Sequence, residues 1–163
     1  MTDEGQSRDA RFEELYGALF QRVLAYARRR VGPELAKDIA AETFTVVWAK
    51  LDAVPEEAAP WIFATARNIT LAKRRGETRW APTVLRDVDE VIEDHAETVA
   101  QVLDALALMT EPDRELLMLI CWDGLTPNEA AKVLGCSRTA LGVRVFRARR
   151  RLERGLFHTE KEH

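Results

Sequence analysis

The sequence lacks the residue groupings on which most catalytic and metal sites depend. Cys121 and Cys136 are its two cysteines and have neither the number nor the spacing of a zinc site, and its three histidines are scattered. It has no nucleophile with a neighbouring base and no glycine-rich phosphate loop. We therefore expect no catalytic residue, no bound metal and no cofactor, and we expect each cysteine to fill a small apolar space.

Long hydrophobic runs are also missing, and none is apolar enough to span a membrane. The N-terminal stretch MTDEGQSRDARFEELY is charged and lacks the apolar core of a signal peptide. These absences predict a cytoplasmic protein without membrane contact of its own. Since 47% of the residues are hydrophobic and 31% are charged, the chain is expected to fold as a globular protein.

Apolar residues recur at steps of three and four along most of the chain, with no alternating strand pattern and no internal repeat. This periodicity predicts an all-α protein. Gly32 and Pro33 separate two helices, and a proline among acids marks a loop from Asp52 to Ala58. The predicted helices run from Phe12 to Arg30, Ala36 to Leu51, Pro60 to Arg79, Thr98 to Met109 and, after a break at Thr110, Glu111 and Pro112, from Asp113 to Trp122.

Two further helices joined by a tight turn are predicted within residues 125–152, LTPNEAAKVLGCSRTALGVRVFRARRRL. Thr126 and Glu129 form a capping box around Pro127, which needs no amide at the first helical position. Gly135 supplies the left-handed residue that ends a helix, and Ser137 can cap the next one. These signals predict a helix-turn-helix. The apolar face of its second helix is expected to be buried and comprises Leu141, Val145, Ala148 and Leu152.

Charge is distributed unevenly, although the formal net charge is only -3. Residues 138–154 hold seven basic side chains and one acid, whereas residues 87–97 hold six acids and no base. A local basic surface can bind a polyanion even on a slightly acidic molecule. The alternative for this basic helix is an ordinary solvated face. For a second basic cluster, Arg67 to Arg79, the alternative is charge that compensates a helix dipole.

Three stretches together resemble the extracytoplasmic-function sigma factors, the small sigma-70-type subunits that direct bacterial RNA polymerase to promoters. The stretch AKDIAAETFTVVWAKL is similar to the family's region 2.2, PWIFATARNITLAKRRGETR to regions 2.3 and 2.4, and ALALMTEPDRELLMLICWDGLTPNEAAKVLGCSRTALGVRVFRARRRL to region 4. The resemblance covers nearly the whole chain. It implies an N-terminal helical bundle at 1–78, a flexible acidic linker at 79–97, a C-terminal helix-turn-helix domain at 98–158 and a tail at 159–163.

The resemblance also implies partners and roles. Core RNA polymerase is expected to bind through its largest-subunit coiled coil and its flap, and an anti-sigma factor is expected as a further partner. The coiled coil would contact Asp38, Glu42 and Thr43. Melted minus-10 promoter DNA would contact Asp52, Ala53, Val54, Arg67, Asn68, Lys73 and Arg74. Duplex minus-35 DNA would be read in the major groove by Arg138, Thr139, Gly142, Val143, Arg144, Phe146, Arg147 and Arg150.

The recognition helix departs from the family pattern at two positions. Gly142 and Val143 stand where relatives often have a basic residue and then a serine. Gly142 is expected to weaken the helix by about 1 kcal/mol relative to alanine. We expect Val143 to touch a thymine methyl and base reading to shift to neighbouring side chains, namely Arg138, Thr139, Phe146 and Arg147.

The aromatic residues suggest a core rather than a stacking platform. Trp48, Trp61 and Phe63 fall within apolar stripes and are expected to be buried, whereas Trp80, in the linker, is the expected exposed aromatic. A stand-alone helix-turn-helix regulator, binding paired half-sites as a dimer, is a second class of function that fits the C-terminal half. The short stretch after Leu152 predicts no fused C-terminal sensing domain.

Overall fold

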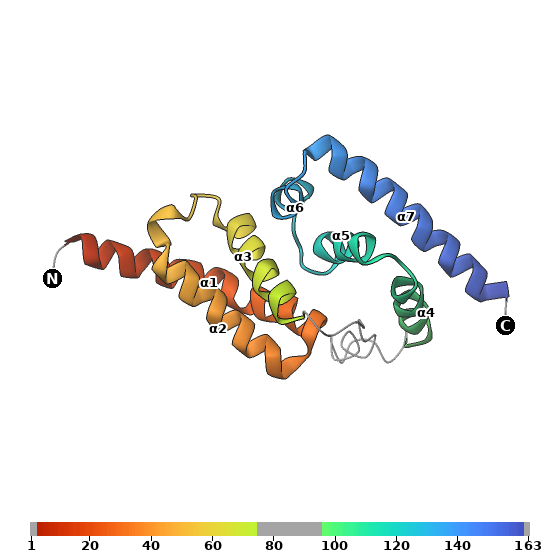
Figure 1. Cartoon of the computed structure of the whole chain (residues 1–163), viewed down its shortest axis with the longest axis horizontal. Helices are drawn as coiled ribbons and strands as arrows, with labels where there is room; N and C mark the ends of the chain where they lie inside the picture. Colours follow the sequence, from red (N-terminus) through yellow and green to blue (C-terminus); the bar gives the residue numbers. More distant parts are fainter. Residues whose placement is uncertain (1–2, 75–95, 162–163) are drawn as a thin grey trace. The chain divides into compact units, whose positions relative to one another are not determined.

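The computed structural model of the protein describes residues 3–74 and 96–161 (Figure 1). The described residues form helices joined by short turns and loops, without a strand among them, which confirms the all-α prediction. The chain divides into two compact units, Met1–Thr78 and Arg79–His163, called the N-terminal and the C-terminal unit below. Trp80 lies outside the described residues, as does the predicted linker except for Ala96 and Glu97, which begin a helix.

The N-terminal unit contains α1 (Asp3–Val31), α2 (Pro33–Ala49), the short 3-10 helix η1 (Leu51–Ala53) and α3 (Ala58–Lys73). The break predicted between the first two helices is confirmed. Gly32 has a φ of 86°, which glycine adopts at little cost, and Pro33 opens α2 where no amide hydrogen is needed. Each of α1, α2 and α3 contacts the other two. Their shared core includes Val23, Ala27, Ile39, Val47, Ile62 and Phe63.

The helix starts differ from the predicted ones by a few residues or more. α1 begins at Asp3, well before Phe12, and its first turn holds two acids that suit the helix dipole. α2 and α3 begin at Pro33 and Ala58, each slightly before the predicted residue. The predicted extension of α3 beyond Arg74 lies outside the described residues.

An aromatic cluster joins α1 to α2 and comprises Phe12, Tyr16, Phe20, Phe44 and Trp48. Phe63 is buried as predicted and Trp61 is half-buried, but Trp48 is 42% exposed, so its predicted burial is wrong. The Trp48 ring meets Phe12 edge-on at 5.2 Å and the Arg8 guanidinium at 5.2 Å. A periodic sequence pattern does not separate such a position at the rim of a core from one inside it.

The C-terminal unit contains α4 (Ala96–Ala107), α5 (Glu111–Cys121), α6 (Pro127–Leu134) and α7 (Arg138–Lys161). α7 packs on the other three helices. It runs through Gly142 and past Leu152 without interruption, and Gly155 lies close to Ala105 of α4. The core of this unit includes Leu103, Leu106, Leu116, Leu119, Leu125, Leu141 and Ala148.

The predicted break between α4 and α5 is present, but it lies at residues 108–110 and not at 110–112. Thr110 is the N-cap, and its side-chain hydroxyl accepts a hydrogen bond from the amide of Asp113 at 3.4 Å. Glu111 and Pro112 form the first turn, where a proline loses nothing by lacking an amide hydrogen. The predicted break therefore ended two residues too late, because proline is favoured in the first turn of a helix.

Candidate nucleic-acid interface

The turn between α6 and α7 is built by the local signals predicted from the sequence. The amide of Thr126 donates to the Glu129 carboxylate at 3.1 Å, and the Glu129 amide donates to the Thr126 hydroxyl at 3.2 Å. Gly135 ends α6 with a φ of 68°. The Ser137 hydroxyl then accepts from the amide of Ala140 at 3.1 Å, which caps α7. The predicted helix-turn-helix is therefore present with its caps.

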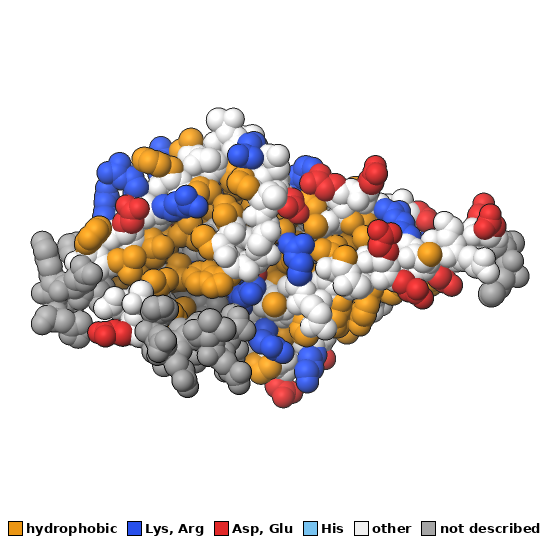
Figure 2. Space-filling model, turned by 180° about the vertical axis from the view of Figure 1, so that it is seen from behind, with side chains coloured by type: hydrophobic (Ala, Val, Ile, Leu, Met, Phe, Trp, Pro, Cys, Tyr) orange, Lys and Arg blue, Asp and Glu red, His pale blue; other side chains and the backbone are white. Residues whose placement is uncertain are grey.

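The two faces of α7 have different environments. Leu141 and Ala148 are fully buried, and Val145 and Leu152 are half-buried. On the other side, Phe146 is 61% exposed. Figure 2 shows basic side chains along α7 with hydrophobic side chains between them. The exposed residues of the predicted DNA-reading set are Arg138, Thr139, Gly142, Val143, Phe146, Arg147 and Arg150, while Arg144 is half-buried.

Several arginines of α7 already have contacts within the C-terminal unit. Arg138 donates to the side-chain oxygen of Asn128 at 3.0 Å and so links the two helices of the motif. Arg144 lies 3.9 Å from the Cys136 sulfur. Arg150 lies over the Phe146 ring, 5.6 Å from its centroid. Arg151 forms an ion pair with Asp113 of α5 and therefore helps to hold α7 in position.

The N-terminal unit carries the predicted minus-10 residues on η1, the loop after it, and α3. Asp52 and Ala53 are exposed, with 92% of the Asp52 side chain accessible to solvent, but Val54 is only 3% exposed. A buried side chain offers no surface to DNA, so Val54 does not fit the predicted DNA contact. It packs on the core side of the loop instead. On α3 the corresponding residues are spread over two helical turns. Asn68 and Lys73 are exposed, and Arg67 and Arg74 are half-buried.

The predicted polymerase-binding residues lie on α2, and two of the three are exposed. Asp38 and Glu42 are one turn apart on the solvent side. Glu42 also forms an ion pair with Lys73 at 3.2 Å. This pair joins a residue of the predicted polymerase-binding set to a residue of the predicted minus-10 set. Thr43 is fully buried, and its hydroxyl donates to the Ile39 carbonyl at 2.7 Å. Thr43 thus has no surface with which to contact a partner.

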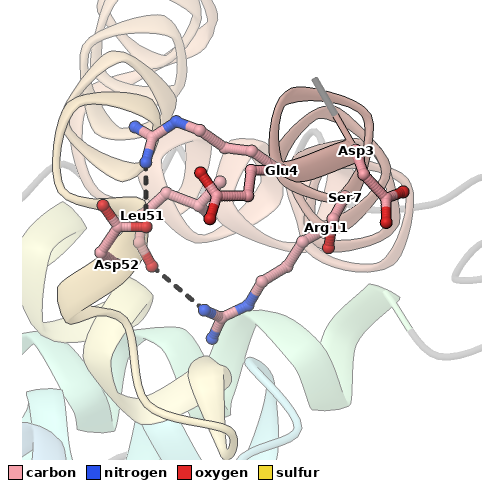
Figure 3. A pocket seen from close by; sticks show the side chains of 7 residues that line it. Asp3, Glu4, Ser7, Arg11, Leu51 and Asp52 are labelled. Atoms are coloured by element: carbon pink, nitrogen blue, oxygen red, sulfur yellow. Dashed lines mark hydrogen bonds and ion pairs between the residues drawn. The ribbon is translucent and has the colours of Figure 1, made fainter. Parts of the chain in front are cut away.

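Two arginines of α1 that no sequence pattern marked form part of this region. A hollow at the N-terminal end of α1 is lined by Asp3, Glu4, Ser7, Arg8, Arg11, Leu51 and Asp52 (Figure 3). Arg8 pairs with Asp52 at 3.0 Å, and Arg11 donates to the Leu51 carbonyl at 3.2 Å. Every residue has a backbone carbonyl, so residue types do not show which carbonyl will accept a hydrogen bond from Arg11. This contact therefore could not be predicted from the sequence. Acidic side chains gather on the N-terminal part of α1 (Figure 2).

No helix within residues 3–74 and 96–161 combines the length and apolar character required to cross a membrane. The same ranges contain no group of three or more histidine, cysteine, aspartate or glutamate side chains arranged to hold a metal ion.

Comparisons with known proteins agree on one family. Residues 100–152 match the family model "Sigma-70, region 4". The chain is 30% identical over 176 aligned residues to the RNA polymerase sigma factor NccH of Alcaligenes xylosoxydans xylosoxydans, and the alignment covers 92% of each chain. The chain therefore belongs to the sigma-70 family, and within it to the extracytoplasmic-function sigma factors. It directs transcription through RNA polymerase.

Solved structures show the same fold. CnrH, in a complex with the cytosolic domain of CnrY, matches with a TM-score of 0.60 and 24% identity, covering 90% of this chain and 88% of CnrH. The sigma factor RpoE, in a complex with the anti-sigma factor NepR from Bartonella quintana, matches with a TM-score of 0.57 and 23% identity. That match covers 96% of this chain and 98% of RpoE.

Proposed function

We propose that this sigma factor recognises promoter DNA through two separate surfaces, one in each unit. The observation that carries the proposal is the exposed face of α7, where arginines, an exposed phenylalanine and small side chains lie on a correctly capped helix-turn-helix. The domains are residues 1–78, resembling region 2, and residues 98–158, resembling region 4. The protein acts by recognition, without a catalytic residue or cofactor of its own.

The minus-35 surface reads duplex DNA in the major groove. Arg147 and Arg150 are suited to phosphates, because exposed guanidinium groups neutralise phosphate charge without reading sequence. Thr139, Val143 and Phe146 are suited to base edges and thymine methyl groups. Arg138 and Arg144 border this surface and Gly142 lies within it, where the missing side chain lets the backbone come closer to the bases.

The minus-10 surface holds DNA as a melted single strand. Asp52 and Ala53 project from η1 and contact the extruded base, while Val54 supports the turn from the core side. Asn68, with Arg67, Lys73 and Arg74, lines the path of the strand along α3. Unstacking one base costs a few kcal/mol, and contacts with the base and the backbone charge together offset that cost.

Core polymerase binds the acids of α2. Asp38 and Glu42 contact the coiled coil of the largest subunit, and the C-terminal unit contacts the flap. Thr43 supports α2 from the core and does not touch the partner, because its hydroxyl donates to the Ile39 carbonyl. An anti-sigma factor is the second protein partner, which is supported by the folds of CnrH and RpoE, both solved with partner proteins. The protein acts in the cytoplasm.

A reconstitution experiment tests this proposal. The purified protein is passed with bacterial core polymerase over a sizing column, and the mixture then transcribes fragments of the source genome. We expect co-elution and transcripts that start at specific promoters. Free protein that elutes as a dimer and binds palindromic DNA without polymerase would instead indicate a stand-alone regulator.

A further inference from the structure

The backbone of the turn that follows α2, residues 51–55, is held by one arginine of α1. Arg11 of α1 donates hydrogen bonds to three carbonyl oxygens of this turn. They belong to Leu51 at 3.2 Å, Val54 at 2.6 Å and Pro55 at 3.3 Å. These residues lie at least 40 positions from Arg11 along the chain, so the contact exists only in the folded unit.

The chemistry of arginine fits this position. A guanidinium group presents five donors in a rigid plane, and hydrogen bonds from a charged donor are stronger than neutral ones. Arg11 is half-buried, where water competes less for its donors. A lysine at this position keeps the charge but has a compact ammonium group that does not match three fixed carbonyls.

The arrangement of the turn separates its inner side from its outer side. Leu51 and Val54 bury their side chains in the unit, and the amide of Val54 closes the turn on the Leu51 carbonyl at 3.2 Å. Asp52 and Ala53 lie between these two anchors and face solvent. The three carbonyls held by Arg11 flank the two exposed residues, so Arg11 fixes the direction in which both point.

Arg8 makes a different contact with the same region. It donates to the Trp48 carbonyl at 2.7 Å and pairs with the Asp52 carboxylate at 3.0 Å. The Asp52 side chain is 92% exposed, so this pair is screened by water and exchanges readily. Arg8 therefore holds the end of α2 through the Trp48 carbonyl and holds the Asp52 side chain only loosely, whereas Arg11 holds the backbone on both sides of Asp52.

We propose that Arg11 is a positioning residue for minus-10 recognition: its guanidinium fixes the backbone of residues 51–55 so that Asp52 and Ala53 are presented to the extruded base. Arg11 itself does not touch DNA. The inference rests on the minus-10 role proposed above for this turn. It adds a specificity determinant on α1, about forty residues before the residues that it orients.

The test uses the holoenzyme reconstituted with full-length Arg11→Ala, Arg11→Lys or Arg8→Ala. Each transcribes two promoter libraries, one randomised at the minus-10 element and the other at the minus-35 element, and the transcripts are sequenced. For Arg11→Ala we expect the preference for the best minus-10 base to fall on the order of tenfold, because three bonds to a charged donor are lost. The minus-35 preference should stay as in the parent protein.

The companion variants and one physical measurement make the result specific. Arg11→Lys should recover only a small part of the preference, and Arg8→Ala should lower it by about twofold or less, since its ion pair is exposed. Hydrogen exchange should accelerate at the amides of Ala53 and Val54 in Arg11→Ala, while core amides of α2 and α3 stay protected.

Ala53→Trp distinguishes failure of this inference from failure of the proposed function. If Ala53→Trp changes the minus-10 preference and Arg11→Ala leaves it intact, the turn reads DNA but Arg11 does not position it. If neither variant changes the preference, the minus-10 role of the turn is wrong and the inference is wrong with it. Equal loss of both promoter preferences in Arg11→Ala, with a lower melting temperature, would mean a general folding defect and would also overturn the inference.

Discussion

At the scale of residues, adjacent arginines of α7 make different contacts. Arg151 pairs with Asp113 of α5, a largely buried side chain, whereas Arg150 lies over the exposed ring of Phe146. Successive side chains on a helix point about 100° apart, so neighbours meet different surroundings. The basic charge of this helix is thus divided between holding the unit together and facing solvent.

Arg150 gives the first prediction. If it contacts a phosphate, Arg150→Ala should weaken promoter binding by a similar factor at every sequence and reduce the slope of log affinity against log salt by about one. Phe146→Ala is the comparison, because loss of a base contact should change which minus-35 sequence is preferred. Titration of promoter fragments with holoenzyme at several salt concentrations measures both effects. An unchanged salt slope in Arg150→Ala would contradict the phosphate contact.

Arg151 gives the second prediction, which concerns stability. Arg151→Ala removes the partner of Asp113 and should lower the free energy of unfolding by about 1 kcal/mol or less, because the arginine is more than half exposed. Arg149→Ala removes the same charge from an exposed position and is the matched control, expected to change stability little. Urea unfolding followed by circular dichroism measures the difference. Equal midpoints for the two variants would exclude a structural role for Arg151.

At the scale of elements, substitution by alanine should have opposite effects on stability at two glycines of the helix-turn-helix. Gly135 has a φ of 68° and Gly142 lies inside α7, and a Cβ at either position would meet nothing within 4 Å. The backbone conformation alone therefore decides whether alanine raises or lowers the stability of the unit. Gly135→Ala should destabilise the unit by about 1 kcal/mol, and Gly142→Ala should stabilise it by a similar amount.

Thermal unfolding of the two variants checks this third prediction. The melting temperatures should move in opposite directions from that of the parent protein. The DNA preference of Gly142→Ala should be measured as well, because a methyl group is added to the proposed minus-35 surface. A fall in stability for Gly142→Ala would show that the glycine is retained for a reason of folding rather than of recognition.

What could be predicted from the sequence depends on the range of each interaction. Thr126 and Gly135 act on amides and dihedral angles within a few residues, so residue type and order were enough to predict the caps and the turn. The environments of Thr43 and Trp48 depend on which helices pack beside α2, and a single-helix pattern does not contain that information. Arg11 donates to backbone carbonyls of a distant segment. Because every residue has such a carbonyl, the sequence does not show which ones Arg11 will bind.

At the scale of the whole molecule, the chain folds as two units with separate cores. Residues of α1, α2 and α3 bury one core, and residues of α4 to α7 bury the other. Substitutions on the surface of one unit should therefore leave the fold of the other unit intact. The proposed minus-35 surface, in the C-terminal unit, should therefore be separable by mutation from the proposed polymerase-binding face of α2, in the N-terminal unit.

The fourth prediction uses this separation. Reversing Asp38 and Glu42 together to lysine should abolish binding of core polymerase on a sizing column, because both exposed acids of the proposed face change sign. Circular dichroism should show unchanged helix content. The matched control reverses Glu13 and Glu14, exposed acids of α1, and makes the same change in net charge. Unimpaired binding by the α2 variant, or equal loss in the control, would rule out a specific docking role for this face.

The unbroken length of α7 has a mechanical consequence. With 24 residues, the helix is about 36 Å long, and it is a stiff rod at that length. One end carries the residues proposed to enter the groove, and the other packs Gly155 against Ala105 of α4. We expect a force applied near Arg138 to be transmitted along α7 to its contact with α4, about 25 Å away. Because α7 packs on α4, α5 and α6, we expect a tilt of α7 on bound DNA to move the C-terminal unit as a rigid body.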